Sequence, residues 1–445
     1  MIGALLLLTL APNQAAARPE RFVFAHYMAC CPFAGHNASP VALRHEMDLA
    51  ARAGIDGFAV NVGAWIKEPY YQSISSRLFA AAPRDGFKLF FSADASTGLS
   101  AAEVIDMVRR FSNEPSYLRQ SNRPVLSTYG GTFDWYREIL EGLNKEGISV
   151  FFVPNVRRPD NVSKIPGALI ETPDAATIES ILADLTFADG LFYFGAAGRY
   201  HTIAQSIRTG AKLTHHRSKL YMAPVTPYYR GLKQNFRVFE SDGFTGMAEQ
   251  WKAAIESNSD WVEIVTWNDW AESSYVRPFE GETSISLWNG HWGLLTAHDA
   301  YLKLSEYYIK WFKAGRVPVV DRDMVYVFYR PQSSQACESA ISSCPRGSAE
   351  LREDLHIVTE SRGPIAVEIT IGSVRELFHG PGGLNFYKTP TRPGQTAIVA
   401  QSGDAVGRWN APITYDSKDA NVTTFNYLAT CFELIKSGQS APKAQ

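Results

Sequence analysis

An excess of charge of one sign is missing from this chain. Its 43 lysines and arginines face 45 aspartates and glutamates, which gives a formal net charge of −2. No stripe of basic residues runs along the sequence either, and binding to nucleic acid depends on such a surface. We therefore expect no nucleic-acid partner.

Cysteines are also scarce, with five among 445 residues. A chain of this length buries its own core and needs no scaffold of disulfides. Cys337 and Cys344 lie close together in a polar stretch and are the expected disulfide. The adjacent Cys30 and Cys31 either close a vicinal ring, or one of them reaches a distant partner such as Cys431. The odd count leaves at least one thiol unexplained.

Several motifs that hold metals or cofactors are absent. The chain has no CxxC or HExxH pattern, so no metal site is expected. No GxGxxG turn follows the first strand pattern, which argues against a dinucleotide fold. We expect no cofactor.

The longest apolar run, residues 2–11, is too short to span a bilayer. Small residues follow at 15–17, and the pattern predicts a secretory signal peptide over 1–17, although no positive residue precedes the apolar run. No later segment predicts a membrane helix, so we expect a secreted protein, extracellular or in the cell wall. Three acceptor triplets for N-glycosylation agree with this location, at Asn37, Asn161 and Asn421.

Aromatic residues, in contrast, are abundant: 25 Phe, 20 Tyr and 10 Trp. Rings beside polar groups suit sugar recognition, because a ring face stacks on C–H bonds while polar neighbours bind hydroxyls. A large hydrophobic core explains the same count. Composition alone favours the core.

From about residue 21 to 315, short β-branched or aromatic runs alternate with amphipathic stretches. Eight such alternations predict a (β/α)8 barrel rather than an open sheet. The expected strands are 21–27, 56–61, 88–92, 124–128, 149–153, 189–194, 219–224 and 261–266. The expected helices are 41–53, 101–112, 132–146, 201–214, 246–257 and 296–314.

Beyond residue 318 the pattern changes to short strands separated by Gly, Pro and Ser, which predicts a smaller all-β domain of sandwich type. Its expected strands are 323–330, 364–371, 396–401 and 422–434. The predicted organisation is therefore α/β with a C-terminal all-β domain: signal peptide 1–17, catalytic barrel 18–318, sandwich-like domain 319–435 and disordered tail 436–445.

Catalytic residues of such barrels lie at the carboxyl ends of the strands. The densest polar cluster there is residues 267–275, WNDWAESSY, directly after the eighth strand. Asp269 and Glu272 are three residues apart and project from one side of a turn. An apolar wall raises the pKa of one carboxyl while a polar neighbour keeps the other ionised, which is the division glycoside hydrolysis needs. A plain helix N-terminus, where acidic residues are stabilising, explains the pair equally well.

Residues 267–278, WNDWAESSYVRP, resemble the signature of glycoside hydrolase family 71, the fungal α-1,3-glucanases or mutanases. The similarity continues over about residues 20–335. Its further segments are FAHYM 24–28, GIDGFAVNVG 54–63, FFSAD 90–94, RPVLSTYGG 123–131, FVPN 152–155, DGLF 189–192, YMAPVTPYY 221–229, HDAYLKL 298–304 and MVYVFYRP 324–331.

This resemblance implies an inverting, endo-acting hydrolase of α-1,3-glucan, the polysaccharide partner, from fungal walls or bacterial mutan. It implies that Asp269 is the general base and Glu272 the general acid, with the two roles exchangeable. We expect a monomer. The rival hypotheses are a related barrel glycosidase acting on another α-glycan, such as α-mannan or mixed glucan, and a wall-binding protein without turnover.

The resemblance also implies a set of substrate-binding side chains, some binding hydroxyls and others stacking. They are His26, Asn61, Asp94, Tyr129, Asn155, Tyr228, Trp267, Asn268, Trp270 and Tyr275. Two segments depart from the pattern of similar enzymes. Ala29-Cys30-Cys31 replaces a small apolar-glycine pair, and 193–196, YFGA, replaces a Trp-Asp-Ala-Trp run.

Overall fold

The computed structural model describes residues 20–83, 86–155, 172–231, 236–279, 284–286, 294–333, 345–415 and 425–436. Several sequence predictions fall outside these ranges and are not tested by it. They are the signal peptide, the glycosylation sites Asn161 and Asn421, the pair Cys337 and Cys344, and the tail beyond residue 436. Asn37 is described and lies exposed between the first strand and the first helix.

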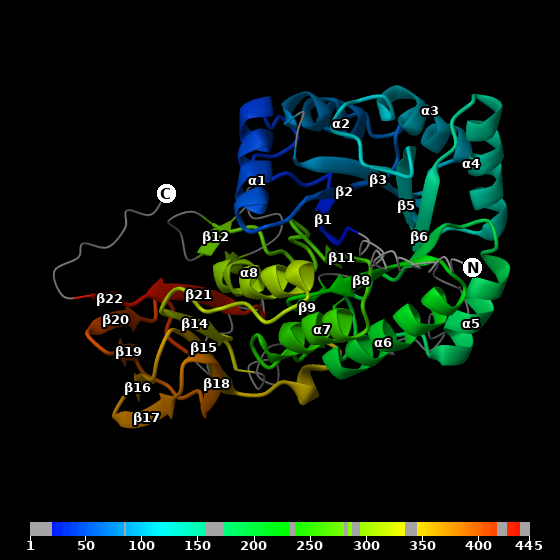
Figure 1. Ribbon diagram of the computed structural model, residues 1–445. Helices are drawn as coiled ribbons and strands as arrows, with labels where there is room; N and C mark the ends of the chain where they lie inside the picture. The colour runs from blue at the N-terminus through cyan, green and yellow to red at the C-terminus, as the bar shows by residue number, and fades with distance from the viewer. Residues whose placement is uncertain are drawn as a thin grey trace, which may run out of the picture.

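Eight parallel strands close into a barrel, which confirms the predicted fold class (Figure 1). The strands follow the order β3-β2-β1-β11-β8-β7-β6-β5, and pairing of β3 with β5, with Phe91 opposite Leu126, closes the ring. Their bounds are β1 Phe22–Met28, β2 Gly57–Val62, β3 Lys88–Asp94, β5 Arg123–Tyr129, β6 Phe151–Asn155, β7 Gly190–Phe192, β8 Leu220–Val225 and β11 Trp261–Ile264. The short β4, Arg119–Gln120, pairs antiparallel with β5. All eight predicted strands are present.

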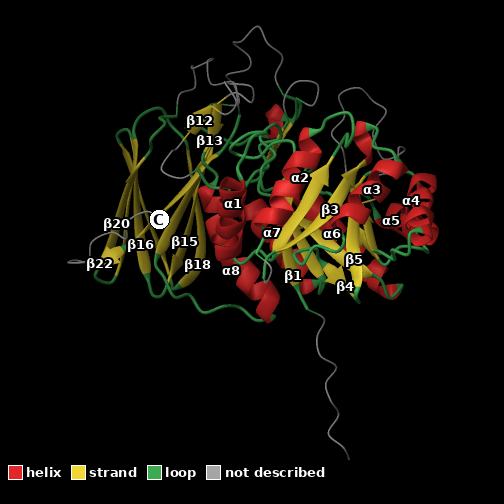
Figure 2. Ribbon diagram, turned by 90° about the horizontal axis from the view of Figure 1, so that it is seen from above, coloured by secondary structure: helices red, strands yellow, loops and turns green. Residues whose placement is uncertain are grey.

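Helices between the strands cover the outside of the barrel (Figure 2). They are α1 Pro40–Arg52, α2 Tyr70–Ala81, α3 Ala101–Phe111, α4 Phe133–Lys145, α5 Ala175–Asp184, α6 Tyr200–His216, α7 Thr245–Glu256 and α8 Asp299–Ala314. α3 shows how the sequence sets these bounds. Ser100 and Glu103 form a capping box at its start, and Val104, Met107, Val108 and Phe111 make its buried stripe. In the described part of the chain, no helix is both long and apolar enough to cross a membrane.

After α8 the chain forms two packed antiparallel sheets. One is ordered β18-β15-β14-β21 and the other β17-β16-β19-β20-β22. Strand β16 alternates buried and half-buried residues along IAVEITI, the pattern of a strand with one face in a core. The bounds are β14 Met324–Tyr329, β15 Asp354–Ser361, β16 Ile365–Ile371, β17 Val374–Gly380, β18 Gly383–Pro390, β19 Thr396–Ser402, β20 Ala405–Asn410, β21 Leu428–Glu433 and β22 Ile435–Lys436.

The hydrophobic core of the barrel extends onto the first sheet of the sandwich, and a second core lies between the two sheets. On β14, Tyr326 and Phe328 join the core of the barrel, whereas Val325 and Val327 face the second sheet. Helix α8 lies between the two parts (Figure 2). α8 ends at Ala314 and β14 begins at Met324, so the boundary that we propose at residue 318 falls in the connection between them.

Two short pairs of antiparallel strands lie in the loops at the mouth of the barrel. Strand β9, Tyr229–Arg230, pairs with β10, Val238–Phe239, directly after β8. Strand β12, Ser284–Ser286, pairs with β13, Leu294–Thr296, after β11. Both pairs follow carboxyl ends of barrel strands, where a barrel of this type builds its site.

Candidate active site

The loop that follows β11 carries Asp269 and Glu272 and is tied down by hydrogen bonds. The amide of Trp267 donates to the carbonyl of His26 on β1 (2.8 Å), and the amide of Asp269 donates to Thr266 Oγ1 (2.8 Å). The amide of Arg230 donates to the carbonyl of Glu272 (2.8 Å). The loop thus contacts the ends of both β1 and β8, so both carboxylates lie at the barrel mouth.

The two carboxylates differ in their surroundings. Asp269 Oδ1 accepts the amide of Glu272 (3.1 Å), and the side chain is only partly open to solvent. Burial and, next, the neighbouring Glu272 carboxylate raise the pKa of Asp269 well above its ordinary value. Two carboxylates this close do not both ionise easily, so the pair tends to retain one proton.

Glu272 lines a pocket and is held there by Tyr229. The Tyr229 hydroxyl donates to Glu272 Oε1 (2.8 Å). Arg237 Nη2 donates in turn to the Tyr229 hydroxyl (3.2 Å), and its guanidinium lies 5.1 Å from the centre of the Tyr229 ring. These two linked hydrogen bonds fix the orientation of the Glu272 carboxylate from the side of β9 and β10.

The pocket encloses about 410 Å³ of empty space, part of it open to solvent. Among the predicted substrate-binding residues it collects Tyr129 and Asn155, from the ends of β5 and β6, and it also collects Glu272. The remaining lining residues are Tyr193, Phe194, Ala196, Ala197, Tyr229 and Arg237. Rings, one amide, one cation and one carboxylate are the mixture of groups that suits a sugar.

Phe194 lines this pocket and also contacts His26, which lies with Asn61 and Asp94 in a group that we call the polar floor. Its ring lies edge-on to both His26 (4.7 Å between centres) and Tyr129 (4.9 Å). His26 Nδ1 is 2.6 Å from Glu263 Oε1 on β11, whereas His26 Nε2 has no hydrogen-bond partner in the described part of the chain.

Asp94 belongs to the same floor. Burial raises the pKa of Asp94, and hydrogen bonds from Ser96 and Asn61 partly offset that shift. Ser96 donates through both its amide (2.9 Å) and its hydroxyl (2.6 Å) to Asp94 Oδ1. His26, Asn61 and Asp94 are therefore grouped, as the strand ends predict.

Five of the predicted substrate ligands are packed into the structure by contacts within the chain, and their role toward the sugar stays a prediction. All five are buried: Tyr228, Trp267, Asn268, Trp270 and Tyr275. Their polar atoms already have partners within the chain. The indole of Trp267 donates to Glu46 Oε2 (2.9 Å), and the hydroxyl of Tyr275 donates to the carbonyl of Thr296 (2.6 Å). The hydroxyl of Tyr228 donates to the carbonyl of Phe425. Through these hydrogen bonds the aromatic residues of the motif hold the loop in place.

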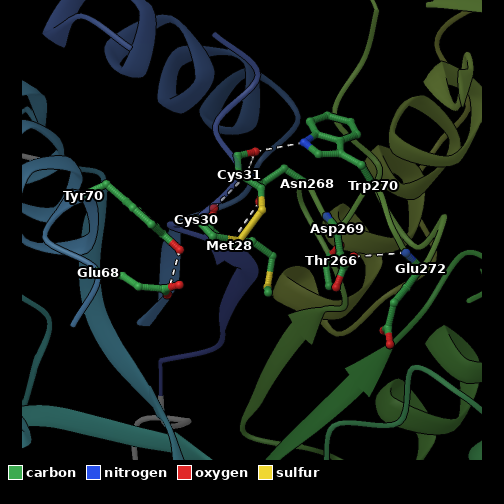
Figure 3. The surroundings of a disulfide bond; sticks show 10 residues. All are labelled: Met28, Cys30, Cys31, Glu68, Tyr70, Thr266, Asn268, Asp269, Trp270 and Glu272. Carbon is green, nitrogen blue, oxygen red and sulfur yellow. Dashed lines mark hydrogen bonds between the residues drawn. A yellow bond between two sulfur atoms is a disulfide. The ribbon is translucent and has the colours of Figure 1, made fainter. Parts of the chain in front are cut away.

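Asn268 and Trp270 share one partner, the turn after β1 (Figure 3). Cys30 and Cys31 of this turn form a disulfide with each other, which resolves the alternatives that the sequence left open. Among the described residues, Cys431 has no disulfide partner. Figure 3 shows the disulfide between the Glu68–Tyr70 hydrogen bond and the loop of Asp269.

Five residues of the site are missing from the predicted set: Phe194, Tyr193, Glu263, Arg237 and Tyr229. Phe194 and Tyr193 follow β7 directly, so their position at a strand end was a usable signal. Glu263 is a carboxylate inside a strand of otherwise apolar residues, WVEI, which was a second signal. Arg237 had none, because only the β9–β10 pairing brings it to the pocket.

Neither the pocket nor its floor holds a metal-binding arrangement. Within the described ranges, no three His, Cys, Asp or Glu side chains are grouped closely enough to hold an ion.

Comparison with known proteins gives the context of this site. The model of Glycosyl hydrolase family 71 matches residues 19–440, nearly the whole chain. The chain belongs to glycoside hydrolase family 71. A glucan endo-1,3-alpha-glucosidase of Schizosaccharomyces pombe, agn1, is 27% identical over 425 residues, covering 89% of this chain and 92% of that protein. A mutanase of Penicillium rubens is 24% identical over 408 residues, covering 86% of this chain and 85% of that protein.

Solved structures show a similar barrel. An endo-alpha-mannosidase of family 99 from Bacteroides thetaiotaomicron aligns with a TM-score of 0.50 at 16% identity, over 66% of this chain and 98% of that one. At this identity the likeness concerns the fold alone. This family 71 protein is a glycoside hydrolase built on a (β/α)8 barrel, and Asp269 and Glu272 are the carboxylates at the mouth of that barrel.

Proposed function

We propose that this enzyme hydrolyses the α-1,3-glucosidic bonds of α-glucan, acting within the chain and inverting the anomeric carbon. The observation that carries the proposal is the pair Asp269 and Glu272 on the β11 loop, with Glu272 in the pocket wall. The name of the Schizosaccharomyces pombe relative, a glucan endo-1,3-alpha-glucosidase, supplies the linkage. A third relative, an ascus wall endo-1,3-alpha-glucanase of Schizosaccharomyces pombe, supports action outside the cell or in its wall.

Position supports the division of roles between the carboxylates. A general acid must touch the glycosidic oxygen, whereas a general base can act through one water. Glu272 lines the pocket and Asp269 is not among its lining residues. We therefore assign Glu272 as proton donor to the leaving oxygen and Asp269 as the base that activates water.

The reaction is then a single displacement. Asp269 takes a proton from a water molecule while the oxygen of that water bonds to the anomeric carbon. The bond from that carbon to the glycosidic oxygen breaks at the same time, and Glu272 transfers its proton to the leaving oxygen. Burial near Glu272 raises the pKa of Asp269, and a raised pKa makes a stronger base once the group is ionised.

The pocket supplies binding rather than chemistry. Tyr129 and Phe194 offer ring surface to the sugar, and Asn155 offers an amide. Arg237 Nε is buried without a hydrogen-bond partner in the described part of the chain, and we assign it to a sugar hydroxyl. A formal net charge of −2 is compatible with a neutral polysaccharide.

The decisive test compares Asp269→Asn, Glu272→Gln and wild type on α-1,3-glucan, α-1,4-glucan and α-mannan. We expect sugar release from α-1,3-glucan only, and a fall of about 10²–10⁴-fold in either variant. Unchanged release by both variants, or preferential release from another glycan, refutes the proposal. Proton NMR of the first product should show the β anomer, and an α anomer contradicts inversion.

The roles are separated with an α-glycosyl fluoride of an α-1,3-linked disaccharide, because fluoride leaves without a proton donor. We expect Glu272→Gln to retain most of its turnover on the fluoride and Asp269→Asn to lose it. The opposite pattern exchanges the two roles while leaving the hydrolase assignment intact.

A further inference from the structure

The turn directly after β1 contains a disulfide between consecutive residues, Cys30 and Cys31. A bond between neighbouring cysteines closes a small ring that includes their shared peptide, so it restricts the backbone at that point. The same turn is anchored on its other side by Ala29, whose amide donates to the carbonyl of Asn61 on β2 (3.2 Å). The turn is thus a stiff part of the barrel mouth.

This turn holds the residues on both sides of Asp269. The carbonyl of Cys31 accepts the side-chain amide of Asn268 (2.8 Å) and the indole of Trp270 (2.9 Å). Asn268 also bonds Met28 twice, accepting its amide (2.7 Å) and donating to its carbonyl (3.1 Å). We call Met28–Cys31 together with Asn268 and Trp270 the β1 clamp.

Asp269 has no comparable anchor of its own. Its amide donates to Thr266 Oγ1, and its carboxylate accepts the amide of Glu272, both within the same loop. Its placement relative to the barrel depends on the anchors of its loop, and the side-chain anchors of both its neighbours, Asn268 and Trp270, end on the disulfide turn (Figure 3).

We propose that the Cys30–Cys31 disulfide is a positioning device for Asp269, so that the enzyme reaches its full rate only when this bond is formed. The proposal rests on the catalytic role of Asp269 given above. Opening the ring frees the Cys30–Cys31 peptide to rotate and moves the Cys31 carbonyl away from Asn268 and Trp270. A displacement of about 1 Å at a reacting group can lower a rate by roughly 10²-fold.

The redox chemistry is reversible. Dithiothreitol breaks the S–S bond, its two thiols are oxidised to a cyclic disulfide, and the protein gains two thiols. Glutathione disulfide reverses the change, forming the bond again and releasing two glutathione thiols. Cys30 is only partly buried, so a small thiol can reach its sulfur.

The experiment measures kcat and KM of the full-length enzyme on α-1,3-glucan and on the glycosyl fluoride, before and after dithiothreitol, and again after glutathione disulfide. We expect reduction to lower kcat about 10- to 100-fold on both substrates, with KM within twofold, and reoxidation to restore it. Both substrates are affected because both need Asp269. The variant Cys30→Ser/Cys31→Ser should be equally slow and insensitive to reductant.

Three controls make the result specific. Cys431→Ser removes the cysteine that is unpaired in the described residues and should behave as wild type, including its response to reductant. Cys337→Ser/Cys344→Ser should also keep that response. Circular dichroism of the reduced enzyme should show an unchanged spectrum, since a general loss of structure would lower turnover for another reason.

The proposed role of the disulfide is refuted if the double serine variant has the kcat of wild type. It is also refuted if reduction leaves the kcat of the wild-type enzyme unchanged. Failure of the proposed function has a different signature, namely full turnover by Asp269→Asn. If Asp269→Asn is inactive while the double serine variant is fully active, Asp269 keeps its role as general base and only the positioning role of the disulfide is refuted.

Discussion

The two halves of the barrel mouth are built by different means. The half formed by the β1 and β11 ends carries the carboxylates and is held by directed hydrogen bonds, such as those of Asn268 to Met28 and Cys31. The half formed by the β5, β6 and β7 ends is held by ring packing, with Phe194 against Tyr129. Hydrogen bonds fix angles, whereas packed rings tolerate adjustment. We infer that chemistry lies in the hydrogen-bonded half and sugar binding in the ring-packed half, which we call the adaptable half.

The largest expected difference between the two halves comes from replacing one asparagine in each of them. Asn268→Ala loses three hydrogen bonds to the β1 turn, and we expect kcat to fall by about 10²-fold. Asn155→Ala loses one contact to the amide of Phe194 (3.3 Å), and we expect mainly a higher KM. Steady-state kinetics on α-1,3-glucan checks both, and equal kcat losses would contradict the division.

Tyr229 connects the halves, because it lines the pocket and donates to Glu272 Oε1 (2.8 Å). Tyr229→Phe keeps the ring and removes that hydrogen bond. Since one hydrogen bond to a charged group contributes about 1.5–3 kcal/mol, we expect kcat on polysaccharide to fall about tenfold or more. The matched control is Tyr193→Phe, a second tyrosine that lines the pocket. Turnover of the glycosyl fluoride by Tyr229→Phe should change much less, because Glu272 is not needed there.

Phe194 tests the adaptable half. Phe194→Ala removes the ring that packs on His26 and Tyr129 and forms part of the pocket wall. We expect KM to rise about 3- to 10-fold with kcat within twofold, since the ring supplies apolar pocket surface and no group that exchanges a proton. A loss confined to kcat would show that Phe194 positions the reacting groups instead.

The smallest expected effect concerns stability. The pKa of Asp269 is raised in the folded enzyme, so ionising this group costs free energy of folding. The cost is absent below the unfolded value of about 3.9, grows as the pH rises from there to the raised value, and stays constant above it. Asp269→Asn should therefore increase Tm by about 1–3 °C at pH 7 and leave it unchanged near pH 3. Thermal unfolding at both pH values measures this, and a lower Tm at pH 7 would contradict the assigned shift.

The fold was readable from the sequence because periodic signals were strong. Every barrel strand was predicted, since each is a short apolar run between helical stretches. Helix α2, YYQSISSRLFAA, was missed because its polar and apolar residues do not separate clearly, and α5 is short. In the sandwich, β17 and β18 escaped notice because their mostly exposed or half-buried residues carry no alternating apolar pattern.

The site was readable only where position along the chain decides location. Strand ends placed His26, Asn61, Asp94, Tyr129 and Asn155 at the mouth, and the structure places them there. Trp267 and Trp270 were assigned to the sugar because they flank a carboxylate, yet their indoles point into the core toward Glu46 and Cys31. Sequence gives neighbours along the chain but not the direction of a side chain on an irregular loop. That direction depends on long-range partners such as Glu46.

The hydrogen bond from Tyr228 to the carbonyl of Phe425 has a practical meaning for anyone redesigning this enzyme. Tyr228 precedes Tyr229, the residue that touches Glu272, so the C-terminal sandwich reaches to within one residue of the pocket wall. A shortened enzyme that ends at residue 318 would lose this support as well as the shared core. The sandwich is better regarded as scaffolding for the catalyst than as an interchangeable attachment, and exchanging it between relatives should alter turnover.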